Sequence, residues 1–531
     1  MILCNLKLRL NETYCFIGAV TPFSFDGMKL GVIKRMSSSF SRAVELLPPS
    51  LNWVNNDFYT GSGKGLDVIN KATGGVVMTS ASASDADVDT AVKSAHAAYQ
   101  KFRDMPAAER GQLLLKAATL LEERTSDFAH LETLDTGKPY YESEMDVGTG
   151  VDALRFIGGI VQNYHGNHYD LGGNFAYTSR EPLGVIGGIG PWNYPLQTAC
   201  WKIAPALACG NSLVYKCSEY TPLSTVALAA LLKEAGLPAG VFNIVAGDGS
   251  VGAALTSHPD VSKLSFTGSV PTGKRIMSKA SDSLKKVTLE LGGKSPLIIF
   301  DDVDMKNAVS TAMLANFFSQ GAVCSNGTRV FVHRSILQEF TAQLVERTKK
   351  LKIGNPMEDD VKVGATICKM QYDKILNYLD IAKKEGAEVL CGGGPVVPDS
   401  PELEGGLYIA PTVLGSCTDD MTVVKEEVFG PVLSILVFDS EEEVIRRAND
   451  TPFGLAAAVC TQNLSRAYRV ISKLEAGSCN INTFNAYPAV IPFGGYKNSG
   501  IGRELGEECL NYYSQTKSVY VETGDPWCPF E

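Results

Sequence analysis

Short apolar segments alternate with helical segments between residues 185 and 300, and this alternation constrains the fold more than any other feature of the chain. The stretches "NSLVYK" and "VFNIVAGDG" have the composition of buried strands, and "YTPLSTVALAALLKEAGLPAG" between them has that of a helix. Strands and helices that alternate in this way build βαβ units around a parallel sheet. We therefore expect an α/β protein with a doubly wound, Rossmann-like nucleotide-binding domain.

The segments on either side extend this pattern. From about residue 87 to residue 138, apolar residues recur at helical spacing and predict two helices. A second α/β unit is predicted from Asp304 onward, where "MKNAVSTAMLANFFSQGAVC" reads as a helix that brings Cys324 to its end or to the loop after it. The stretches "RVFVHRS" and "VLSILVF" are predicted strands of this second unit.

Length and charge exclude several classes of protein. At ~150 residues per domain, 531 residues predict two to four folding units, enough to form a deep cleft. A hydrophobic content of 45% and a charged content of 20% are typical of a soluble globular chain, and no apolar window reaches the ~18 residues of a membrane span. The net charge of -10 argues against a nucleic-acid partner.

The cysteines and histidines indicate neither a disulfide framework nor a metal site. The chain has 13 cysteines, an odd number without C-x-x-C spacing, and 6 histidines, none of them paired at i, i+4. We predict no metal and a reducing compartment, the cytoplasm. Residues 1–56 are basic and poor in acidic residues, so they are expected to be an unstructured extension or, alternatively, a mitochondrial transit peptide.

Two segments are candidates for binding a dinucleotide. In "SFTGSVPTGKRI", Gly268 and Gly273 follow a strand, and a helix that opens at Gly273 would direct free amide groups at a pyrophosphate. An ordinary strand-to-helix loop is the alternative. In "VYKCSEY", Lys216 and Glu219 at the end of a strand could bind ribose hydroxyls, and the carboxylate would favour NAD over NADP. The alternative there is a surface salt bridge.

Three further residues could carry chemistry. Glu290 in "TLELGGKSP" either faces solvent or is desolvated and suited to general base catalysis. Asn193 in "PWNYP" is framed by two aromatic residues and two prolines, which suits an oxyanion donor. The alternative is an asparagine that only forms a turn. Cys324 alone would be interpreted as a small buried hydrophobe. Together with Glu290, Asn193 and a nucleotide-binding sheet, it suggests a thiol nucleophile.

Six motifs, in the order "PWNYP", "FTGSVPTGK", "LELGGKSP", "FFSQGAVCSNGTR", "KEEVFGPV" and "PFGGYKNSGIGRELG", closely resemble the NAD(P)-dependent aldehyde dehydrogenase superfamily. The resemblance runs from Leu51 to the C-terminus. It implies NAD-dependent oxidation of an aldehyde to a carboxylic acid through a thiohemiacetal and a thioester. Cys324 would be the nucleophile, Glu290 the general base and Asn193 the oxyanion donor.

The resemblance also implies roles for residues around these three. Cofactor contacts would come from Trp192, Lys216, Glu219, Gly268, Ser269, Gly273, Glu427 and Phe429. A substrate tunnel would be lined by Tyr194, Trp201, Phe318, Tyr487 and Phe493, and Glu504 would lie near a proton exit.

The stretches "CSNGTRVFV" and "YYSQTKSVYVETGD" look most like the branch that oxidises 4-trimethylaminobutyraldehyde, of carnitine biosynthesis, and other betaine and amino aldehydes. Ala322 and Ser325 depart from that branch, which more often has Gln and a second Cys, and Tyr487 stands where a smaller residue is common. A broad aliphatic aldehyde dehydrogenase is the alternative. A cofactor-independent esterase or thioesterase and a non-catalytic scaffold are alternatives of other classes.

The resemblance implies three structural parts. They are an NAD-binding domain at 57–163 and 183–292, a catalytic domain at 293–498, and a small β arm at 164–182 and 510–523. Such arms usually complete a sheet of a neighbouring subunit, so the resemblance implies a homodimer or a homotetramer.

Overall fold

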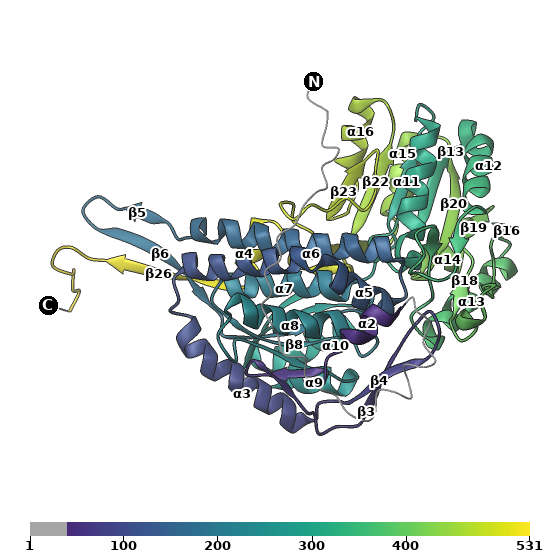
Figure 1. Ribbon diagram of the computed structural model, residues 1–531. Helices are drawn as coiled ribbons and strands as arrows, with labels where there is room; N and C mark the ends of the chain where they lie inside the picture. Colours follow the sequence, from purple (N-terminus) through teal and green to yellow (C-terminus); the bar gives the residue numbers. More distant parts are fainter. Residues whose placement is uncertain (1–39, 531) are drawn as a thin grey trace, which may run out of the picture. The chain divides into compact units, whose positions relative to one another are not determined.

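The computed structural model describes residues 40–530, and its first sheet is the expected nucleotide-binding sheet (Figure 1). Its strand order is β2-β1-β9-β8-β7-β10-β11-β25. The strands β9, β8, β7, β10 and β11 are parallel, the antiparallel pair β1 and β2 extends the sheet beyond β9 with β2 at the edge, and the antiparallel strand β25 forms the other edge. The strands are β1 (Asn52–Val54), β2 (Asp57–Tyr59), β7 (Val185–Ile189), β8 (Ser212–Lys216), β9 (Phe242–Val245), β10 (Val261–Thr267), β11 (Lys286–Glu290) and β25 (Gly500–Ile501).

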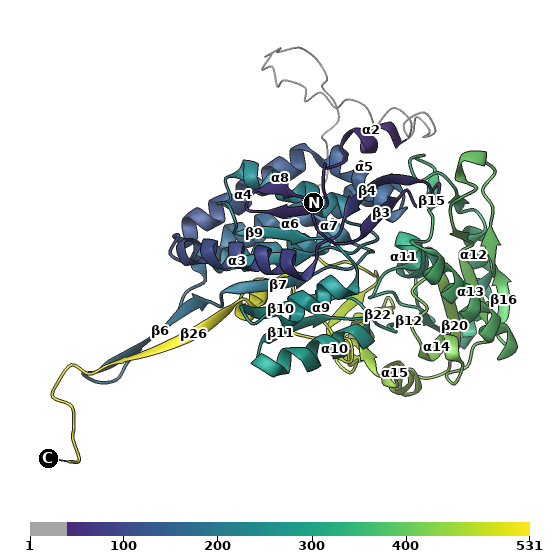
Figure 2. The ribbon, with the colours of Figure 1, turned by 90° about the horizontal axis from the view of Figure 1, so that it is seen from below.

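Helices cover both faces of this sheet, which explains why β7, β8 and β9 are buried along their whole length and mostly lack polar side chains. One face carries α3 (Asp85–Phe102), α9 (Gly249–Ser257) and α10 (Val270–Ala280). The other face carries α7 (Pro195–Ala208) and α8 (Leu223–Ala235), with α4 (Ala107–Glu123), α5 (Thr125–Thr136) and α6 (Tyr140–Ile160) packed against them (Figure 2).

The second sheet belongs to the second predicted α/β unit and has the order β16-β19-β20-β13-β12-β22-β23. Successive side chains of a strand in this sheet point to opposite faces and pack in two different hydrophobic cores. Leu297 and Ile299 pack with α11 and α12, whereas Ile298 packs with α13, α15 and α16. The strands are β12 (Pro296–Ile299), β13 (Arg329–His333), β16 (Glu388–Cys391), β19 (Thr412–Gly415), β20 (Val432–Phe438), β22 (Ala456–Cys460) and β23 (Ser478–Ile481). The helices are α11 (Met305–Phe317), α12 (Leu337–Thr348), α13 (Lys369–Lys384), α15 (Glu441–Asn449) and α16 (Leu464–Ile471).

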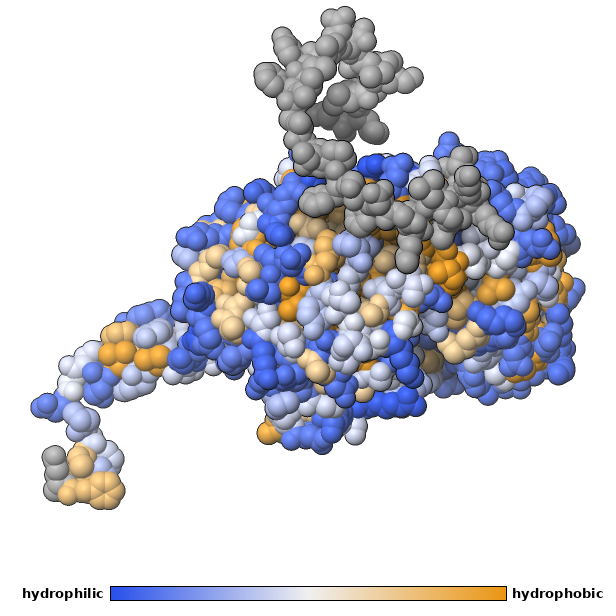
Figure 3. Space-filling view, turned by 60° about the horizontal axis from the view of Figure 1, so that its bottom comes forward, coloured by the Kyte–Doolittle hydropathy of each residue, from blue (hydrophilic) through white to orange (hydrophobic). Residues whose placement is uncertain are grey.

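A third, three-stranded sheet forms a projecting arm from β5 (His168–Asp170), β6 (Phe175–Pro182) and β26 (Ser514–Val521), in the order β26-β6-β5 (Figure 1). Its strands lie within the two segments predicted for the arm. The arm exposes Tyr169, Leu171, Tyr177 and Tyr520 to solvent. Hydrophobic residues gather on it in Figure 3.

Two expectations differ from the structure. The prediction that residues 1–56 are an unstructured extension is wrong for residues 40–56, because β1 pairs with β9 and the short helix α2 (Ser41–Glu45) packs on α5. Residues 1–39 lie outside the described residues. The segment from residue 87 to residue 138 forms three helices rather than two, because the helical path breaks at Pro106 and again at Arg124. Within residues 40–530 no helix combines the length and apolarity that crossing a membrane requires.

Candidate active site

A cavity of about 1020 Å³ opens at the carboxyl ends of the parallel strands of the first sheet. Strands β8 and β9 lie on one side of β7, and β10 and β11 lie on its other side. The chain order therefore reverses beside β7, and α/β sheets bind ligands at such a reversal. Residues from the second α/β unit, including Cys324 and Glu427, close the cavity from the opposite side.

Cys324 lies in the loop between the 3₁₀ turn Phe318–Gly321 and β13, as the sequence predicted, and its side chain is partly exposed to the cavity. Burial raises the pKa of the Cys324 thiol to about 12, and the carboxylates of Glu427 and Glu290 add to the shift. The thiol is therefore protonated at neutral pH in this state. A positive charge placed beside it would favour the thiolate.

Glu290 is the last residue of β11 and is only 3% exposed, so its side chain is desolvated rather than on the solvent face. Neither carboxylate oxygen has a hydrogen-bond partner within residues 40–530. Burial raises the pKa of Glu290, and the nearby Glu504 carboxylate raises it further. A Cβ at Gly494 would approach the Glu290 Oε1 to 2.9 Å, so a glycine there leaves room for the carboxylate.

Asn193 sits between β7 and α7, and its side-chain amide points to the loop that carries Cys324. The amide Nδ2 donates to the Ala322 carbonyl at 2.7 Å. A side-chain amide nitrogen carries two hydrogens, so the second remains available to another acceptor. This bond fixes the donor beside Cys324, which favours the oxyanion interpretation over a turn asparagine.

Glu504 is buried behind Glu290 and does not line the cavity. Its Oε1 accepts from the Lys202 ammonium at 2.6 Å and from the Ser265 hydroxyl at 3.2 Å. Lys202 also donates to the Thr267 hydroxyl at 2.8 Å. A chain of polar groups therefore leads inward from the carboxyl end of β10.

The predicted ribose ligands Lys216 and Glu219 line the cavity and form a 2.8 Å ion pair with each other. Deeper in the cavity, the Trp192 and Phe429 rings meet edge to face at 5.2 Å. Glu427 accepts from the Gly293 amide at 3.1 Å. Its carboxylate occupies the space that the Gly292-Gly293 pair leaves open, since a Cβ at Gly292 would come within 2.2 Å of it.

The predicted start of the phosphate-binding helix is wrong by one turn. Helix α10 begins at Val270 with Ser269 as its N-cap, and the extended backbone of Ser269 followed by Pro271 in the first turn explains this start. The Gly273 amide is consequently bonded to the Ser269 carbonyl at 2.9 Å, and the Gly268 amide to the Glu290 carbonyl at 3.0 Å. Gly268 and Ser269 line the cavity, whereas Gly273 packs against Leu291.

All five predicted tunnel residues line the cavity near Cys324. Three of their rings form a continuous row, with centroid distances of 5.3 Å between Trp201 and Phe493 and 4.8 Å between Phe493 and Tyr487. The Trp201 indole nitrogen and the Tyr487 hydroxyl are buried and have no hydrogen-bond partner in the described part of the chain. The wall is therefore aromatic with two free polar groups.

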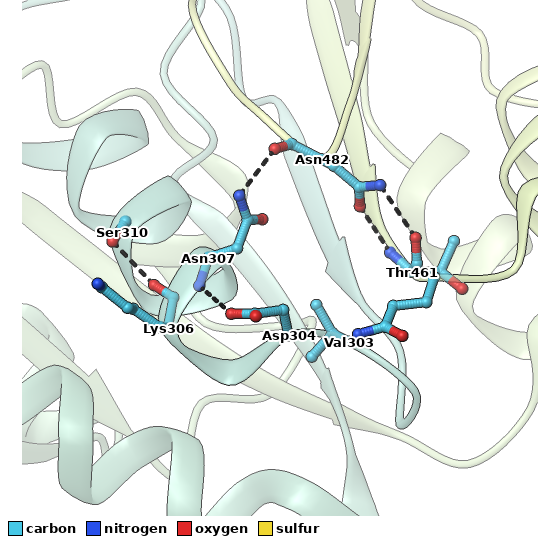
Figure 4. A pocket seen from close by; sticks show the side chains of 8 residues that line it. Val303, Asp304, Lys306, Asn307, Ser310, Thr461 and Asn482 are labelled. Carbon is cyan, nitrogen blue, oxygen red and sulfur yellow. Dashed lines mark hydrogen bonds between the residues drawn. The ribbon is translucent and has the colours of Figure 1, made fainter. Parts of the chain in front are cut away.

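A second hollow, of about 500 Å³, lies at the carboxyl ends of β22 and β23 beside the start of α11 (Figure 4). Its polar groups bond to one another. The Thr461 amide donates to the Asn482 side chain at 2.9 Å, and the Asn307 side chain donates to the Asn482 carbonyl at 3.3 Å. These bonds attach the start of α11 to two strand ends and so help to fix the helix that leads to Cys324.

The family model described as "Aldehyde dehydrogenase family" matches residues 58–519. The chain belongs to the aldehyde dehydrogenase family. It is 52% identical to "4-trimethylaminobutyraldehyde dehydrogenase B" of Danio rerio over 459 residues, which cover 86% of this chain and 89% of the relative. It is 50% identical to "Betaine aldehyde dehydrogenase" of Mesorhizobium japonicum over 485 residues, which cover 91% of this chain and 99% of the relative.

Among solved structures, a betaine aldehyde dehydrogenase from Staphylococcus aureus in complex with NAD+ superposes with a TM-score of 0.90 at 39% identity, covering 93% of this chain and 99% of that chain. These likenesses confirm the predicted fold and the oxidation of an aldehyde with NAD(P). The cavity of this aldehyde dehydrogenase fits such a cofactor, because it combines the reversal of strand order, the Lys216–Glu219 pair and the start of α10.

Sequence reasoning missed several charged residues of the aldehyde dehydrogenase site. Lys202 stands alone in the apolar helix "PLQTACWKIAPALA", and an isolated lysine in such a helix is a signal that could have revealed a buried charge. Asp146 lines the cavity from α6, and Lys138 pairs with it. No spacing in the sequence connects either of them to Asn193.

Proposed function

We propose that this aldehyde dehydrogenase oxidises aldehydes that carry a trimethylammonium or amino group, 4-trimethylaminobutyraldehyde above all, and that Cys324, Glu290 and Asn193 carry out the reaction. The observation that supports the proposal is their convergence on one cavity, which has an aromatic wall at one end and the dinucleotide-type strand ends at the other. The relatives named above act on aldehydes of this class by their names.

The Cys324 thiol first gives up its proton to water in the cavity, and the resulting thiolate adds to the aldehyde carbon, so that negative charge passes to the carbonyl oxygen. The free hydrogen of the Asn193 amide, whose other hydrogen is bonded to the Ala322 carbonyl, and the Cys324 backbone N–H would donate to that oxygen. Bound NAD(P) supplies the hydride acceptor, and its oxidised ring carries a positive charge. Loss of hydride leaves the acyl group on Cys324 as a thioester.

Glu290 would complete the reaction by accepting a proton from the water that attacks the thioester. Burial and the neighbouring Glu504 carboxylate raise its pKa, which makes it a stronger base than an exposed carboxylate. Glu504 and Lys202 behind it offer a route by which that proton could leave toward the interior.

The substrate class follows from the aromatic row of Trp201, Phe493 and Tyr487. Aromatic faces attract a quaternary ammonium group by about 0.5–2 kcal/mol. The same rings would also bind an alkyl chain by burial alone, so charge is the property that distinguishes the two substrate classes.

We also propose a preference for NAD over NADP and assembly into a homodimer or homotetramer. The Glu219 carboxylate at the cavity wall would repel a 2′-phosphate. The arm has free edges on β5 and β26 and exposes apolar residues, as expected of a segment that pairs with another subunit.

Initial rates of NADH formation test the substrate proposal. We would compare 4-trimethylaminobutyraldehyde and betaine aldehyde with hexanal and with 5,5-dimethylhexanal, the neutral isostere of the first substrate. The proposal expects kcat/KM to be at least about tenfold higher for the trimethylammonium substrate than for its isostere. Trp201→Leu should reduce that ratio several-fold. Equal use of the isostere would contradict the substrate class and leave the oxidation of aldehydes in place.

A further inference from the structure

A buried lysine lies directly behind the proposed oxyanion donor. Lys138 follows Gly137, whose φ of +79° ends α5, and its side chain is 1% exposed. Its ammonium is paired with Asp146 and donates to the backbone carbonyl of Asn193 at 2.7 Å. It also lies 4.1 Å from the centre of the Tyr194 ring. Lys138 therefore contacts the backbone that presents the Asn193 amide.

Lys138 is the shared cation of three buried carboxyl groups. Burial raises the pKa of Glu132 to about 7, that of Glu142 to about 8 and that of Asp146 to about 6, and the Lys138 charge opposes each shift. A cation enclosed by several carboxyl groups is fixed in position, because any displacement weakens several interactions at once.

One of these carboxyl groups, that of Glu142, contacts the loop that carries Cys324. Glu142 Oε2 accepts from the Ser319 amide at 2.8 Å, and Glu142 Oε1 accepts from the Tyr141 hydroxyl at 3.0 Å. Ser319 and Gln320 have φ values of +50° and +52°, in the left-handed region. Such a conformation costs about 1–3 kcal/mol per residue and persists only where surrounding contacts enforce it. Glu142 supplies one such contact at Ser319, which lies five residues before Cys324.

The hydrogen bond from the Asn193 amide to the Ala322 carbonyl connects the contacts of Lys138 with those of Glu142. From α6 one path runs through Lys138 to Asn193 and the other through Glu142 to Ser319, and the two meet where the Asn193 amide donates to the Ala322 carbonyl at 2.7 Å. Lys138, which lies two residues before α6 and pairs with Asp146 of that helix, thus contacts the oxyanion donor, and Glu142 in the first turn of α6 contacts the loop of the nucleophile.

We propose that Lys138 and Glu142 are positioning residues of the aldehyde dehydrogenase reaction, which hold the Asn193 amide and the Cys324 loop at a fixed separation. The inference rests on the proposed role of Asn193. An oxyanion donor is effective only if it is in place before charge develops, and a displacement of about 1 Å can cost about a hundredfold in rate.

Kinetics of Lys138→Met test this inference in the full-length enzyme. We expect kcat to fall by about 10- to 100-fold with KM and NAD affinity within about twofold, because the contact acts in the transition state. Lys285→Met is the matched control. Lys285 is also buried and donates to two backbone carbonyls, those of His258 at 2.7 Å and Val261 at 2.8 Å, but it lies away from the cavity. Lys285→Met should lower the free energy of unfolding without lowering kcat per active site.

A double-mutant cycle separates positioning from general damage. Asn193→Ala alone should lower kcat by about 10²–10³-fold, and in that background Lys138→Met should cost less than about twofold, since its effect passes through Asn193. If Asn193→Ala is without effect, the proposed role of Asn193 fails. If Asn193→Ala acts but Lys138→Met leaves kcat unchanged, or acts equally in both backgrounds, only the present inference is overturned.

Glu142 provides a second test that does not depend on the folding of Lys138→Met. Glu142→Gln keeps an oxygen acceptor for the Ser319 amide and should retain kcat within about threefold, whereas Glu142→Ala removes the acceptor and should lose about tenfold or more. Equal activity of the two variants would contradict the positioning role of Glu142.

Discussion

Cys324 shares its raised pKa with other cysteines of the chain. Burial raises the pKa of Cys209, Cys217 and Cys460 to about 12 as well, with the same leading cause. These three are fully buried within their cores, whereas Cys324 opens onto the cavity beside Glu290 and the Asn193 amide. Access to the cavity and neighbouring groups, rather than the pKa of the resting thiol, therefore distinguish the proposed nucleophile from the other three cysteines.

The pKa of Cys324 should respond to the cofactor. In the free enzyme the thiolate forms only at high pH, and a positive nicotinamide ring nearby favours the charged form, so NAD+ should shift the midpoint of thiolate formation to lower pH. The rate of iodoacetamide alkylation against pH, with and without NAD+, measures this midpoint, with Cys324→Ala as the background. An unchanged or higher midpoint in the presence of NAD+ would contradict the electrostatic account.

At this scale the sequence could single out Cys324, Glu290 and Asn193 as candidates, because their motifs are local, and all three line one cavity. It could not decide whether Glu290 is buried, since flanking leucines fit either face of a strand. That outcome depends on β25 pairing with β11 from about 210 residues away. Nor could it connect Lys138 or Glu142 with the site, because their partners Asn193 and Ser319 are contributed by distant loops.

Gly273 in helix α10 has a different role from the one that the sequence suggested. Gly273 was predicted to open the helix, but the structure places it one turn inside, against Leu291. The glycine spacing suggested phosphate binding, whereas the requirement at Gly273 is close packing of the helix on the chain after β11.

Gly273→Ala should therefore destabilise the enzyme. The added Cβ would lie 2.7 Å from Leu291 Cδ2, and overpacking of this kind costs about 1–3 kcal/mol in the free energy of unfolding. Gly159→Ala in α6 is the control, because its Cβ would meet nothing within 4 Å among the described residues and should be neutral or slightly stabilising. Denaturant unfolding of both variants measures the difference, and equal stability would refute the packing role of Gly273.

In the whole molecule, alternating strands and helices correctly predicted two α/β units, because strands that are covered on both faces, such as β8 and β20, are mostly apolar. The exclusion of residues 40–56 from the fold was wrong in part. Strand β1 has only three residues, and its place in the sheet depends on β9, about 190 residues away.

The arm offers a test of assembly. Tyr169 and Leu171 are 45% and 51% exposed on it, so Tyr169→Lys with Leu171→Lys should convert the enzyme to smaller species if the arm pairs with another subunit. Light scattering coupled to size-exclusion chromatography measures the mass. Leu284→Lys, at a 90% exposed position outside the arm, should leave it unchanged. A wild-type monomer, or an arm variant of unchanged mass, would contradict the proposed role of the arm.

The covalent thioester on Cys324 is the central claim, and Glu290→Gln tests it most directly. This variant removes the base for hydrolysis and keeps the size of the side chain, so the acyl-enzyme should accumulate. Intact-protein mass spectrometry after mixing with NAD+ and 4-trimethylaminobutyraldehyde should show one acyl adduct, absent in Cys324→Ala. It should appear with a burst of about one equivalent of NADH and a steady-state rate lower by about 10²–10⁴-fold. NADH formation at the wild-type rate, or a burst without any adduct on Cys324, would contradict the account.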